Sequence, residues 1–396
     1  MVCVDSRKDF GSTYLSHRPE SEFIRSFVEK VSSELNIGTT ESVYKDKYVG
    51  IKSRVEQIVN GYIDMEPKGD VRFIGICGMS GIGKTTLAEA VFEMIHHQFE
   101  ASSFLRDVKG RDLNDSQDQL LRDMKLKSEI TRWDELKATN VTSLRLRKKR
   151  VIIVVDDADE KRLEILAGHR DWFGAGSRII ITSEDKGLLE KRCGEKNVYK
   201  AKKLSAYDAL QLFIRQAFDE PPCGKDLLDI CNGFVRYVDG HPLALKILGS
   251  SMYGITNIDQ WEAELERVRK SPKLPYKDER NIQKVLRMSY NRLSTPKKKL
   301  FLDVACFLNG EDKDRISDIL EDPGKCIPEI DIKALIDKSL ITVLGGKLWI
   351  HNLLQQMGWE IVNEECMERP EKRSRLWLEE DVLEVLNYSK VSVIVL

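Results

Sequence analysis

The chain carries at residues 78–86 the segment Gly-Met-Ser-Gly-Ile-Gly-Lys-Thr-Thr, which matches the phosphate-binding pattern G-x-x-x-x-G-K-[ST] at every fixed position. A β-prone apolar run at residues 73–77 precedes it, and a helical pattern at residues 87–92 follows it. A phosphate-binding loop needs this order of strand, loop and helix, because the helix then points its positive end at the phosphates. The alternative is a glycine-rich turn with an incidental Lys-Thr pair, and the flanking elements count against it.

The fixed residues of this motif have defined roles toward a phosphate chain. The glycines allow the backbone to approach phosphate oxygens closely, because no side chain intervenes. Lys84 would reach the β- and γ-phosphates, and the hydroxyl group of Thr85 would bind Mg²⁺. The segment therefore predicts a site for a nucleotide and a magnesium ion.

A pair of carboxylates follows the most apolar run of the chain. Residues 151–155 read Val-Ile-Ile-Val-Val and end in Asp156 and Asp157. Carboxylates at the end of a buried strand are costly unless they meet a cation. We expect Asp156 to hold Mg²⁺ through its water shell and Asp157 to orient an attacking water, so both are candidate catalytic residues. A pair of solvated turn aspartates is the alternative.

β-prone runs alternate with helical patterns from about residue 71 to residue 204. These runs lie at residues 73–77, 104–108, 151–155, 179–182 and 198–204. The alternation predicts an α/β fold of the P-loop NTPase class, with a parallel sheet and helices on both faces. Helical patterns then dominate, until two short β-prone runs around a Gly-Gly turn at residues 345–346 predict a hairpin. We therefore expect a helical domain and then a winged-helix domain.

The composition limits the classes of protein to consider. The formal net charge of the 396 residues is -1, so no overall basic field points to nucleic acid. We interpret the basic run at residues 145–150 as a solvated helix end rather than as a nuclear-localisation or nucleic-acid patch. The eight cysteines contain no C-x-x-C pair, which predicts neither a zinc site nor a disulfide framework. No membrane span or signal peptide is predicted, and we expect a cytoplasmic protein, with the nucleus as the alternative.

Further motifs follow one another in a characteristic order. They lie at residues 104–108 (FLRDV), 151–157 (VIIVVDD), 174–182 (GAGSRIIIT), 240–244 (GHPLA), 301–307 (FLDVACF) and 350–354 (IHNLL). Together with the loop at residues 78–86, they resemble the NB-ARC switch of plant disease-resistance proteins, in the branch with an N-terminal TIR domain and C-terminal leucine-rich repeats. The resemblance spans roughly residues 44–388. It implies a molecular switch of plant immunity that rests with ADP and is activated by exchange for ATP.

The resemblance implies a set of nucleotide contacts. The residues that would bind ADP or ATP are Val49, Gly78, Gly81, Gly83, Lys84, Thr85, Thr86, Pro242 and His351. Val49 and Pro242 would border the adenine, and His351 would reach the β-phosphate from the winged-helix domain. His351 would thereby couple the nucleotide to the position of that domain. Thr85 and Asp156 would be the Mg²⁺ ligands.

The resemblance also divides the chain into expected domains. These are residues 1–43 (remnant tail and linker of a TIR domain), 44–204 (nucleotide-binding domain), 205–288 (helical, ARC1-like), 289–388 (winged-helix, ARC2-like) and 389–396 (truncated start of a repeat region, with a β-prone apolar end). Because the catalytic part of a TIR domain is missing, we expect no NADase activity and at most a slow ATPase. The expected partners are a nucleotide and other immune receptors, in a homo- or hetero-oligomer formed through the NB-ARC region, with no nucleic acid.

Two positions depart from the family's pattern. The family has Thr-Thr-Arg after its fourth strand, with the Arg as a candidate γ-phosphate sensor, whereas this chain has Thr182, Ser183 and Glu184. A carboxylate there would repel a triphosphate. Asn352 replaces an Asp, which removes a charge from the latch of the closed state and would loosen autoinhibition.

These departures favour an alternative function. The chain would then be a degenerate adaptor or decoy that keeps ADP and pairs with a full-length immune receptor. A third reading is a transcriptional ATPase that binds DNA through its winged helix, and the weak basic charge of that domain counts against it.

Overall fold

The structure is a computed structural model, and it describes residues 48–63, 69–125, 144, 146–222, 224–270, 278–320 and 328–394. The domain expected at residues 1–43 lies outside these ranges. None of the described helices has both the length and the apolar character that crossing a bilayer requires.

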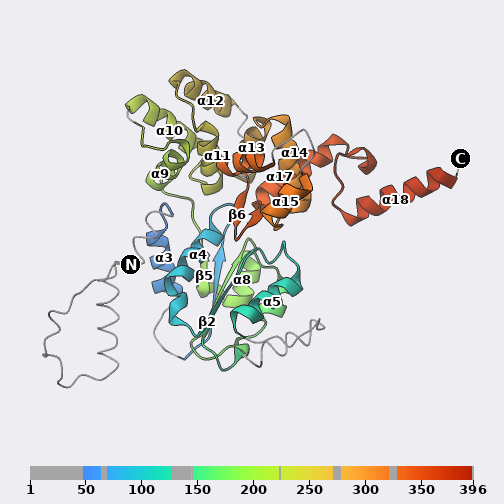
Figure 1. Cartoon of the computed structure of the whole chain (residues 1–396). Coiled ribbons are helices and arrows are strands. Elements are labelled where there is room, and N and C mark those ends of the chain that lie inside the picture. The colour runs from blue at the N-terminus through green and yellow to red at the C-terminus, as the bar shows by residue number, and fades with distance from the viewer. Residues whose placement is uncertain are drawn as a thin grey trace, which may run out of the picture. The chain divides into compact units, whose positions relative to one another are not determined.

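The β-prone runs form a five-stranded parallel sheet with the strand order β2-β3-β4-β1-β5 (Figure 1). Its strands are β1 (Arg72–Cys77), β2 (Ala101–Leu105), β3 (Val151–Val155), β4 (Arg178–Ser183) and β5 (Val198–Lys200). Strands buried on both faces are continuously apolar, which is why β1, β3 and β4 were predicted almost to the residue. β5 is shorter than expected. β2 starts three residues before the predicted run, because its two serines interrupt the apolar pattern that would reveal it. It ends at Leu105, so Arg106 and Asp107 lie in the loop after the strand.

Helices cover both faces of this sheet, as predicted. They are α3 (Lys52–Ile58), α4 (Lys84–Ile95), α5 (Leu113–Asp123), α7 (Glu160–Ala167) and α8 (Lys186–Cys193). Leucines of α5, α7 and α8 share a core cluster with Phe73 and Cys77 of β1. Helix α4 contacts β1, β3 and β4 without joining that cluster, which places it on the other face. The fold is therefore that of a P-loop NTPase, with the loop at the carboxyl end of β1.

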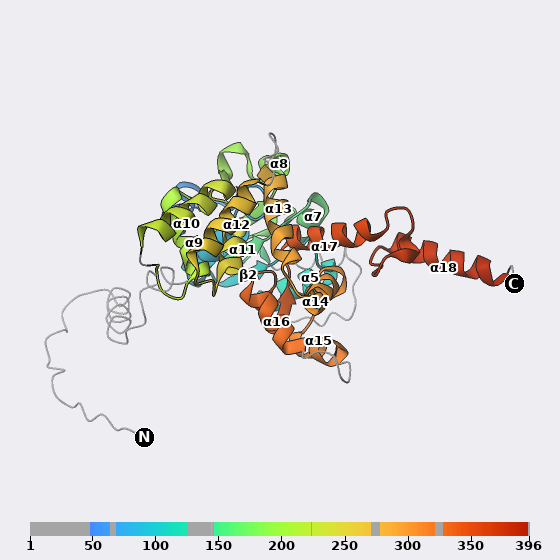
Figure 2. The same cartoon turned by 90° about the horizontal axis from the view of Figure 1, so that it is seen from above.

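A layer of helices follows the sheet domain (Figure 2). It consists of α9 (Ala206–Ala217), α10 (Lys225–Val238), α11 (Pro242–Met252), α12 (Ile258–Lys270) and α13 (Asp278–Asn291). Trp261 is 1% exposed and stacks on Phe218 at 5.0 Å between ring centroids, so aromatic packing holds this layer together. Helix α13 contacts both α11 and α17, and the domain boundary expected between residues 288 and 289 falls inside it.

The last part of the chain has the elements of a winged helix. They are α14 (Thr295–Asp303), α15 (Lys313–Leu320), α16 (Pro328–Asp337), β6 (Thr342–Leu344), β7 (Lys347–Trp349) and α17 (Asn352–Glu365). β6 and β7 form the predicted antiparallel hairpin, and Gly345 and Gly346 both take positive φ in its turn. Short 3-10 and π-helical segments complete the described structure: η1 (Val59–Ile63), η2 (His96–Gln98), η3 (Arg170–Trp172), η4 (Glu195–Asn197), η5 (Val304–Leu308) and η6 (Pro370–Lys372).

The β-prone end expected after residue 388 is wrong as far as the structure describes it. Helix α18 spans Glu379–Ile394 and takes in most of that stretch. Three acidic residues occupy its first turn, where negative charge stabilises a helix, and the β-branched residues simply continue it. The helix that precedes these residues therefore determines their conformation more strongly than their β propensity does.

The phosphate-binding loop is joined to helix α11 by two hydrogen bonds. The Leu243 N–H donates to the Gly81 carbonyl at 3.3 Å, and His241 Nε2 lies 2.9 Å from the Ser80 carbonyl. His241 Nδ1 accepts the Ala244 N–H, so the ring proton is on Nε2, which donates. Gly81 has a φ of +72°, and a β-carbon there would lie 2.7 Å from the His241 ring. The loop and the helical layer are therefore in direct contact.

Gly81→Ala should destabilise the protein more than Gly83→Ala. Both glycines have positive φ, so both alanines pay a backbone cost of about 1–3 kcal/mol. Only the methyl group at residue 81 would meet α11, which adds about 1–3 kcal/mol of overpacking, whereas nothing lies within 4 Å of a β-carbon at residue 83. Urea denaturation of both variants measures the difference in the free energy of unfolding. Equal destabilisation by the two substitutions would contradict the close contact between the loop and α11.

Candidate functional site

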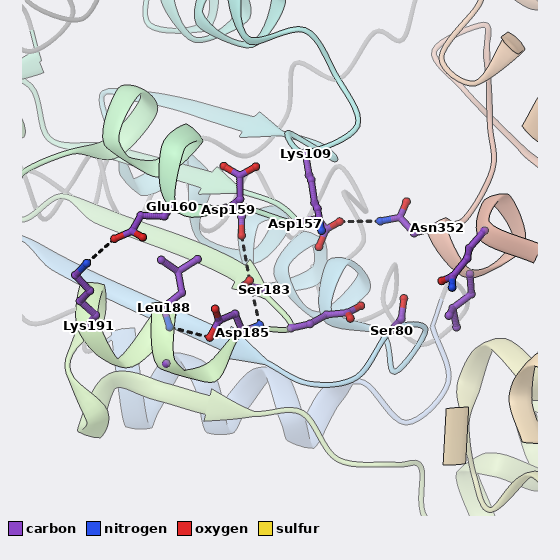
Figure 3. A pocket seen from close by; sticks show the side chains of 15 residues that line it. Ser80, Lys109, Asp157, Asp159, Glu160, Ser183, Asp185, Leu188, Lys191 and Asn352 are labelled. Atoms are coloured by element: carbon purple, nitrogen blue, oxygen red, sulfur yellow. Dashed lines mark hydrogen bonds and ion pairs between the residues drawn. The ribbon is translucent and has the colours of Figure 1, made fainter. Parts of the chain in front are cut away.

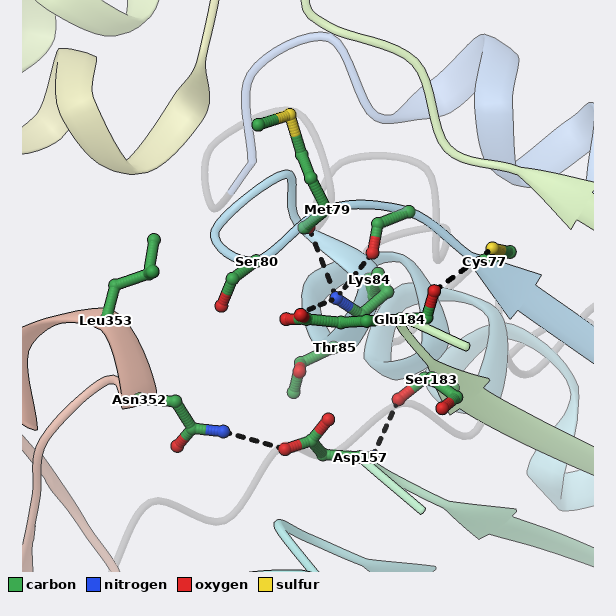
Figure 4. A network of polar contacts seen from close by, with 12 residues as sticks. Cys77, Met79, Ser80, Lys84, Thr85, Asp157, Ser183, Glu184, Asn352 and Leu353 are labelled. Carbon is green, nitrogen blue, oxygen red and sulfur yellow. Dashed lines mark hydrogen bonds and ion pairs between the residues drawn. The ribbon is translucent and has the colours of Figure 1, made fainter. Parts of the chain in front are cut away.

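The ammonium group of Lys84 lies inside the phosphate-binding loop. Its Nζ donates to the carbonyl oxygens of Gly78 at 2.8 Å and Met79 at 3.2 Å, and it lies 3.5 Å from Glu184 Oε1 (Figure 4). Lys84 is 8% exposed, because it is the first residue of α4 and folds back under the loop. The loop therefore presents a fixed positive charge at the end of β1.

Asp156 anchors the second half of the site. It is 3% exposed, and its carboxylate accepts hydrogen bonds from Thr182 Oγ1 at 2.7 Å and Thr85 Oγ1 at 2.9 Å. Burial raises the pKa of this carboxyl group, and the two hydroxyl groups oppose that effect. Asp156 thus connects α4, β3 and β4 in one polar network at the carboxyl edge of the sheet.

Three aspartates gather at this edge. The Asp107 N–H lies 3.5 Å from Asp156 Oδ2, and burial together with the Asp157 and Asp156 carboxylates raises the pKa of Asp107 to about 6. The hydroxyl oxygen of Thr85 and the carboxylate oxygens of Asp156 are of the kind that Mg²⁺ prefers. The described residues contain no group of three His, Cys, Asp or Glu side chains arranged to bind a metal ion. Mg²⁺ held by Thr85 and Asp156 would complete its octahedral shell with water or phosphate oxygens.

His351 is a neutral side chain at the start of α17. Burial, and then the positive charges of Lys84 and neighbouring cations, lower its pKa to about 3. Its Nδ1 accepts the Leu353 N–H at 3.1 Å as the N-cap of the helix, so the ring proton is on Nε2. His351 is thus available as an uncharged hydrogen-bond donor rather than as a cation.

Asn352 bonds directly to the sheet domain. Its Nδ2 donates to Asp157 Oδ2 at 2.7 Å, as Figure 4 shows. Asp157 has a φ of +53°, a conformation that Asp tolerates better than most residues, and its N–H donates to Thr182 Oγ1 at 2.8 Å. The amide at residue 352 therefore bonds α17 to the end of β3, where a second carboxylate would repel Asp157.

Most of the predicted residues line one cleft of about 260 Å³, which we call the phosphate cleft. Its walls include Gly81, Gly83, Lys84, Thr85, Thr86, Asp156, Asp157 and His351. Gly78 is not among the lining residues, but its carbonyl oxygen accepts a hydrogen bond from Lys84, which does line the cleft. Val49 and Pro242 are not among the residues that line the cleft: Val49 packs against the hydrophobic core formed by the helical layer and the winged-helix elements, and Pro242 is the first residue of α11. Their contact with adenine stays a prediction.

A second cleft of about 490 Å³ adjoins the first (Figure 3). The two share Ser80, Asp157, Glu184 and Asn352. Figure 3 shows Asp159, Glu160 and Asp185 around the second cleft. Two lysines, Lys109 and Lys191, also line it, and Lys191 pairs with Glu160. Its acidic walls contrast with the positive charge that the phosphate-binding loop supplies, so anionic phosphates fit the phosphate cleft better.

Sequence reasoning missed two cations of the phosphate cleft. Arg106 follows β2, and Lys246 lies on α11, and both line the cleft together with Lys84. Arg106 was quoted only as part of a strand, and Lys246 follows the motif at residues 240–244 without being part of it. One signal was available for Lys246: it stands four residues after Pro242 and so on the same helix face.

Glu184 forms an ion pair with the lysine of the phosphate-binding loop. The side chain is half exposed and pairs with Lys84 instead of standing alone beside the site. It therefore competes for the ammonium group that a phosphate would use. For an exposed carboxylate this competition is weak, because solvent screens the pair.

Two domain models and several named proteins match the sequence of this chain. The NB-ARC domain model matches residues 51–223, and the winged-helix domain model of Roq1-like disease resistance proteins matches residues 295–366. Disease resistance protein RUN1 of Vitis rotundifolia is 39% identical over 336 residues, which cover 83% of this chain and 24% of RUN1. TMV resistance protein N of Nicotiana glutinosa is 36% identical over 391 residues, which cover 95% of this chain and 32% of N.

The chain thus spans about a quarter to a third of the length of these relatives. Among solved structures, Cdc6p from Pyrobaculum aerophilum is similar with a TM-score of 0.43 and 12% identity, covering 80% of this chain and 97% of Cdc6p. The two matched domains occur in the order that the sequence motifs predicted. The chain therefore belongs to the NB-ARC family of disease resistance proteins, with a Roq1-like winged-helix domain after its nucleotide-binding domain.

Proposed function

We propose that the chain is a nucleotide-dependent switch of plant immunity, which rests with ADP and is activated by exchange for ATP. The observation that carries the proposal is the meeting of two domains at one cleft. Lys84 and Asp156 come from the sheet domain, and His351 comes from the start of α17. A ligand that contacts both walls of such a cleft changes the free energy of the closed arrangement relative to any open one.

The sheet domain would bind the nucleotide. Backbone N–H groups at the start of α4 and the Lys84 ammonium would hold the phosphates, while Thr85 and Asp156 would hold Mg²⁺. Mg²⁺ would supply charge neutralisation between the phosphate oxygens and the three aspartates. Because Thr85 Oγ1 now donates to Asp156, its lone pairs remain for the ion.

The winged-helix domain would sense which nucleotide is bound. His351 would donate a hydrogen bond from Nε2 to a phosphate oxygen, and being neutral it would do so without depending on pH near 7. The bond from Asn352 to Asp157 adds a direct contact between the domains. A γ-phosphate that displaced these contacts would favour opening.

Hydrolysis would be slow in this arrangement. Asp157 is the expected orienting residue for water, and one of its carboxylate oxygens accepts the Asn352 amide. While α17 lies against the end of β3, the hydrogen bond from Asn352 would compete with a water molecule for the Asp157 carboxylate. ATP turnover would therefore require α17 to move away from β3.

The cellular role follows from the relatives rather than from the cleft. Relatives named as disease resistance proteins support a role in immune signalling, and we expect the chain to act in the cytoplasm or nucleus in company with other receptor chains. The adaptor alternative would keep ADP without exchanging it. The ion pair between Glu184 and Lys84 favours that alternative, because it opposes additional phosphate charge.

Lys84→Arg should lower the affinity for ADP by more than about tenfold, since a charge-assisted hydrogen bond is worth about 1.5–3 kcal/mol. The Lys84 ammonium fits between two carbonyls at 2.8 and 3.2 Å, and a planar guanidinium is too large for that place. Titration with a fluorescent ADP analogue measures the affinity. Lys186→Arg on the exposed surface of α8 is the matched control. If Lys84→Arg bound ADP as tightly as the wild type, the assignment of this loop as the nucleotide site would be wrong.

Asn352→Asp should loosen the closed form, although it restores the residue that the family usually has. The substitution replaces the Nδ2 donor at 2.7 Å from Asp157 by a second carboxylate, so an attraction becomes a repulsion. We expect ADP to dissociate about three to ten times faster, because hydrogen bonds to charged groups contribute about 1.5–3 kcal/mol before screening. Stopped-flow displacement of a fluorescent ADP analogue measures this rate.

Asn352→Ala separates the two effects, since it removes the hydrogen bond without adding charge. The dissociation rates should rise in the order wild type, Ala variant, Asp variant. A rate for Asn352→Asp at or below that of the wild type would contradict the bond between α17 and β3 as a closing contact.

A further inference from the structure

Three cationic side chains in the described part of the chain line the phosphate cleft, and two of them form ion pairs with carboxylates. Arg106 makes an ion pair with Glu89 of α4, and Lys84 lies 3.5 Å from Glu184. Lys246 of α11 lines the same cleft. Within the described ranges no ion pair or hydrogen bond of the Lys246 side chain is found, and among the cleft's cations in those ranges it is the only one in that state. Among the described residues, the helical layer thus contributes an ammonium group to the cleft that is not held in an ion pair or a hydrogen bond.

The surroundings of Lys246 place it inside the cleft rather than on an outer surface. The residue is exposed to solvent, yet loss of hydration by the surrounding protein lowers the pKa of Lys246. The carboxylate of Glu89 opposes this shift, and the positive charge of Arg215 adds to it. Its positive charge also contributes, after Lys84, to lowering the pKa of His351. Lys246 therefore acts on the same volume of the cleft as Lys84 and His351.

A second observation fixes how Lys246 is held. It lies in the first turns of α11, whose N-terminal end is bonded to the phosphate-binding loop through Leu243 and His241. The position of its Cα relative to the loop is thereby set by one backbone hydrogen bond and one made by the His241 ring. A side chain with a flexible four-carbon stem can then reach an anion held by the loop.

We propose that Lys246 binds the phosphate groups of the nucleotide and serves as the contact between the helical layer and the phosphate chain. In this chain it supplies the cation that the Thr-Thr-Arg pattern would otherwise place after β4, where Glu184 stands. The inference rests on the proposed function, since it assigns a residue to the same site. It also makes Lys246 a determinant of specificity, because attraction to a point charge grows with the number of phosphates.

Lys246→Met tests the assignment through a series of nucleotides. Methionine keeps the unbranched length and removes the charge. Calorimetric titration of AMP, ADP and ATP with Mg²⁺ should show a loss of about tenfold for ATP, a smaller loss for ADP and almost none for AMP. Lys246→Arg should restore most of the ATP affinity. Lys225→Met removes an exposed charge at the start of α10 as the matched control and should change none of the three.

Equal losses for all three nucleotides would mean that Lys246 supports the fold of α11, and would overturn the phosphate contact. Unchanged affinities in Lys246→Met, with Lys84→Arg still defective, would overturn this inference and leave the proposed function standing. A wild-type protein that binds none of the three nucleotides would overturn both.

Discussion

The arrangement depends on one buried carboxylate. Asp156 is 3% exposed at the end of β3, and leaving a charge there unsatisfied would cost several kcal/mol. Thr85 and Thr182 donate to it, which fixes the first turn of α4 against the ends of β3 and β4. The phosphate-binding loop begins where β1 ends, beside these strands. Its shape is thus set by the same network that prepares a site for a cation.

Two further layers meet at this edge. The N-terminus of α11 bonds to the loop through His241, and the N-terminus of α17 bonds to Asp157 through Asn352. Each contact joins a helix start, rich in donors, to oxygen atoms at the carboxyl end of the sheet. The arrangement of this NB-ARC protein in the structure therefore includes polar contacts around the cleft, and such contacts are easier to exchange for ligand bonds than a large apolar interface would be.

The sequence predicted the sheet well, because strands buried on both faces are continuously apolar and the motif at residues 78–86 has a fixed position between strand and helix. It predicted β2 poorly, since Ser102 and Ser103 interrupt the apolar pattern, and it mistook a helix at residues 391–394 for a β-prone end. Local propensity does not include what an already formed helix imposes on the residues after it.

The candidate site was predicted unevenly for a physical reason. Lys84, Thr85 and Asp156 belong to motifs whose spacing encodes their contacts. The pairing of Asn352 with Asp157 joins residues 195 positions apart, and the approach of Lys246 to the cleft depends on how α11 docks. For Asn352 the neutral amide was expected to loosen the latch, whereas the structure has it donating directly to a carboxylate. Charge alone did not indicate this bond, because the partner of Asn352 was unknown, and the effect on autoinhibition stays a prediction.

In the proposed switch, a diphosphate holds the sheet domain and α17 together. The most direct measurement is the identity and amount of nucleotide released when the purified protein is denatured and its supernatant is separated by ion exchange. We expect ADP at close to one molecule per chain. An empty protein that still binds no added ADP would contradict the proposed switch, because Lys84, Asp156 and His351 would then line a cleft with no nucleotide to bind.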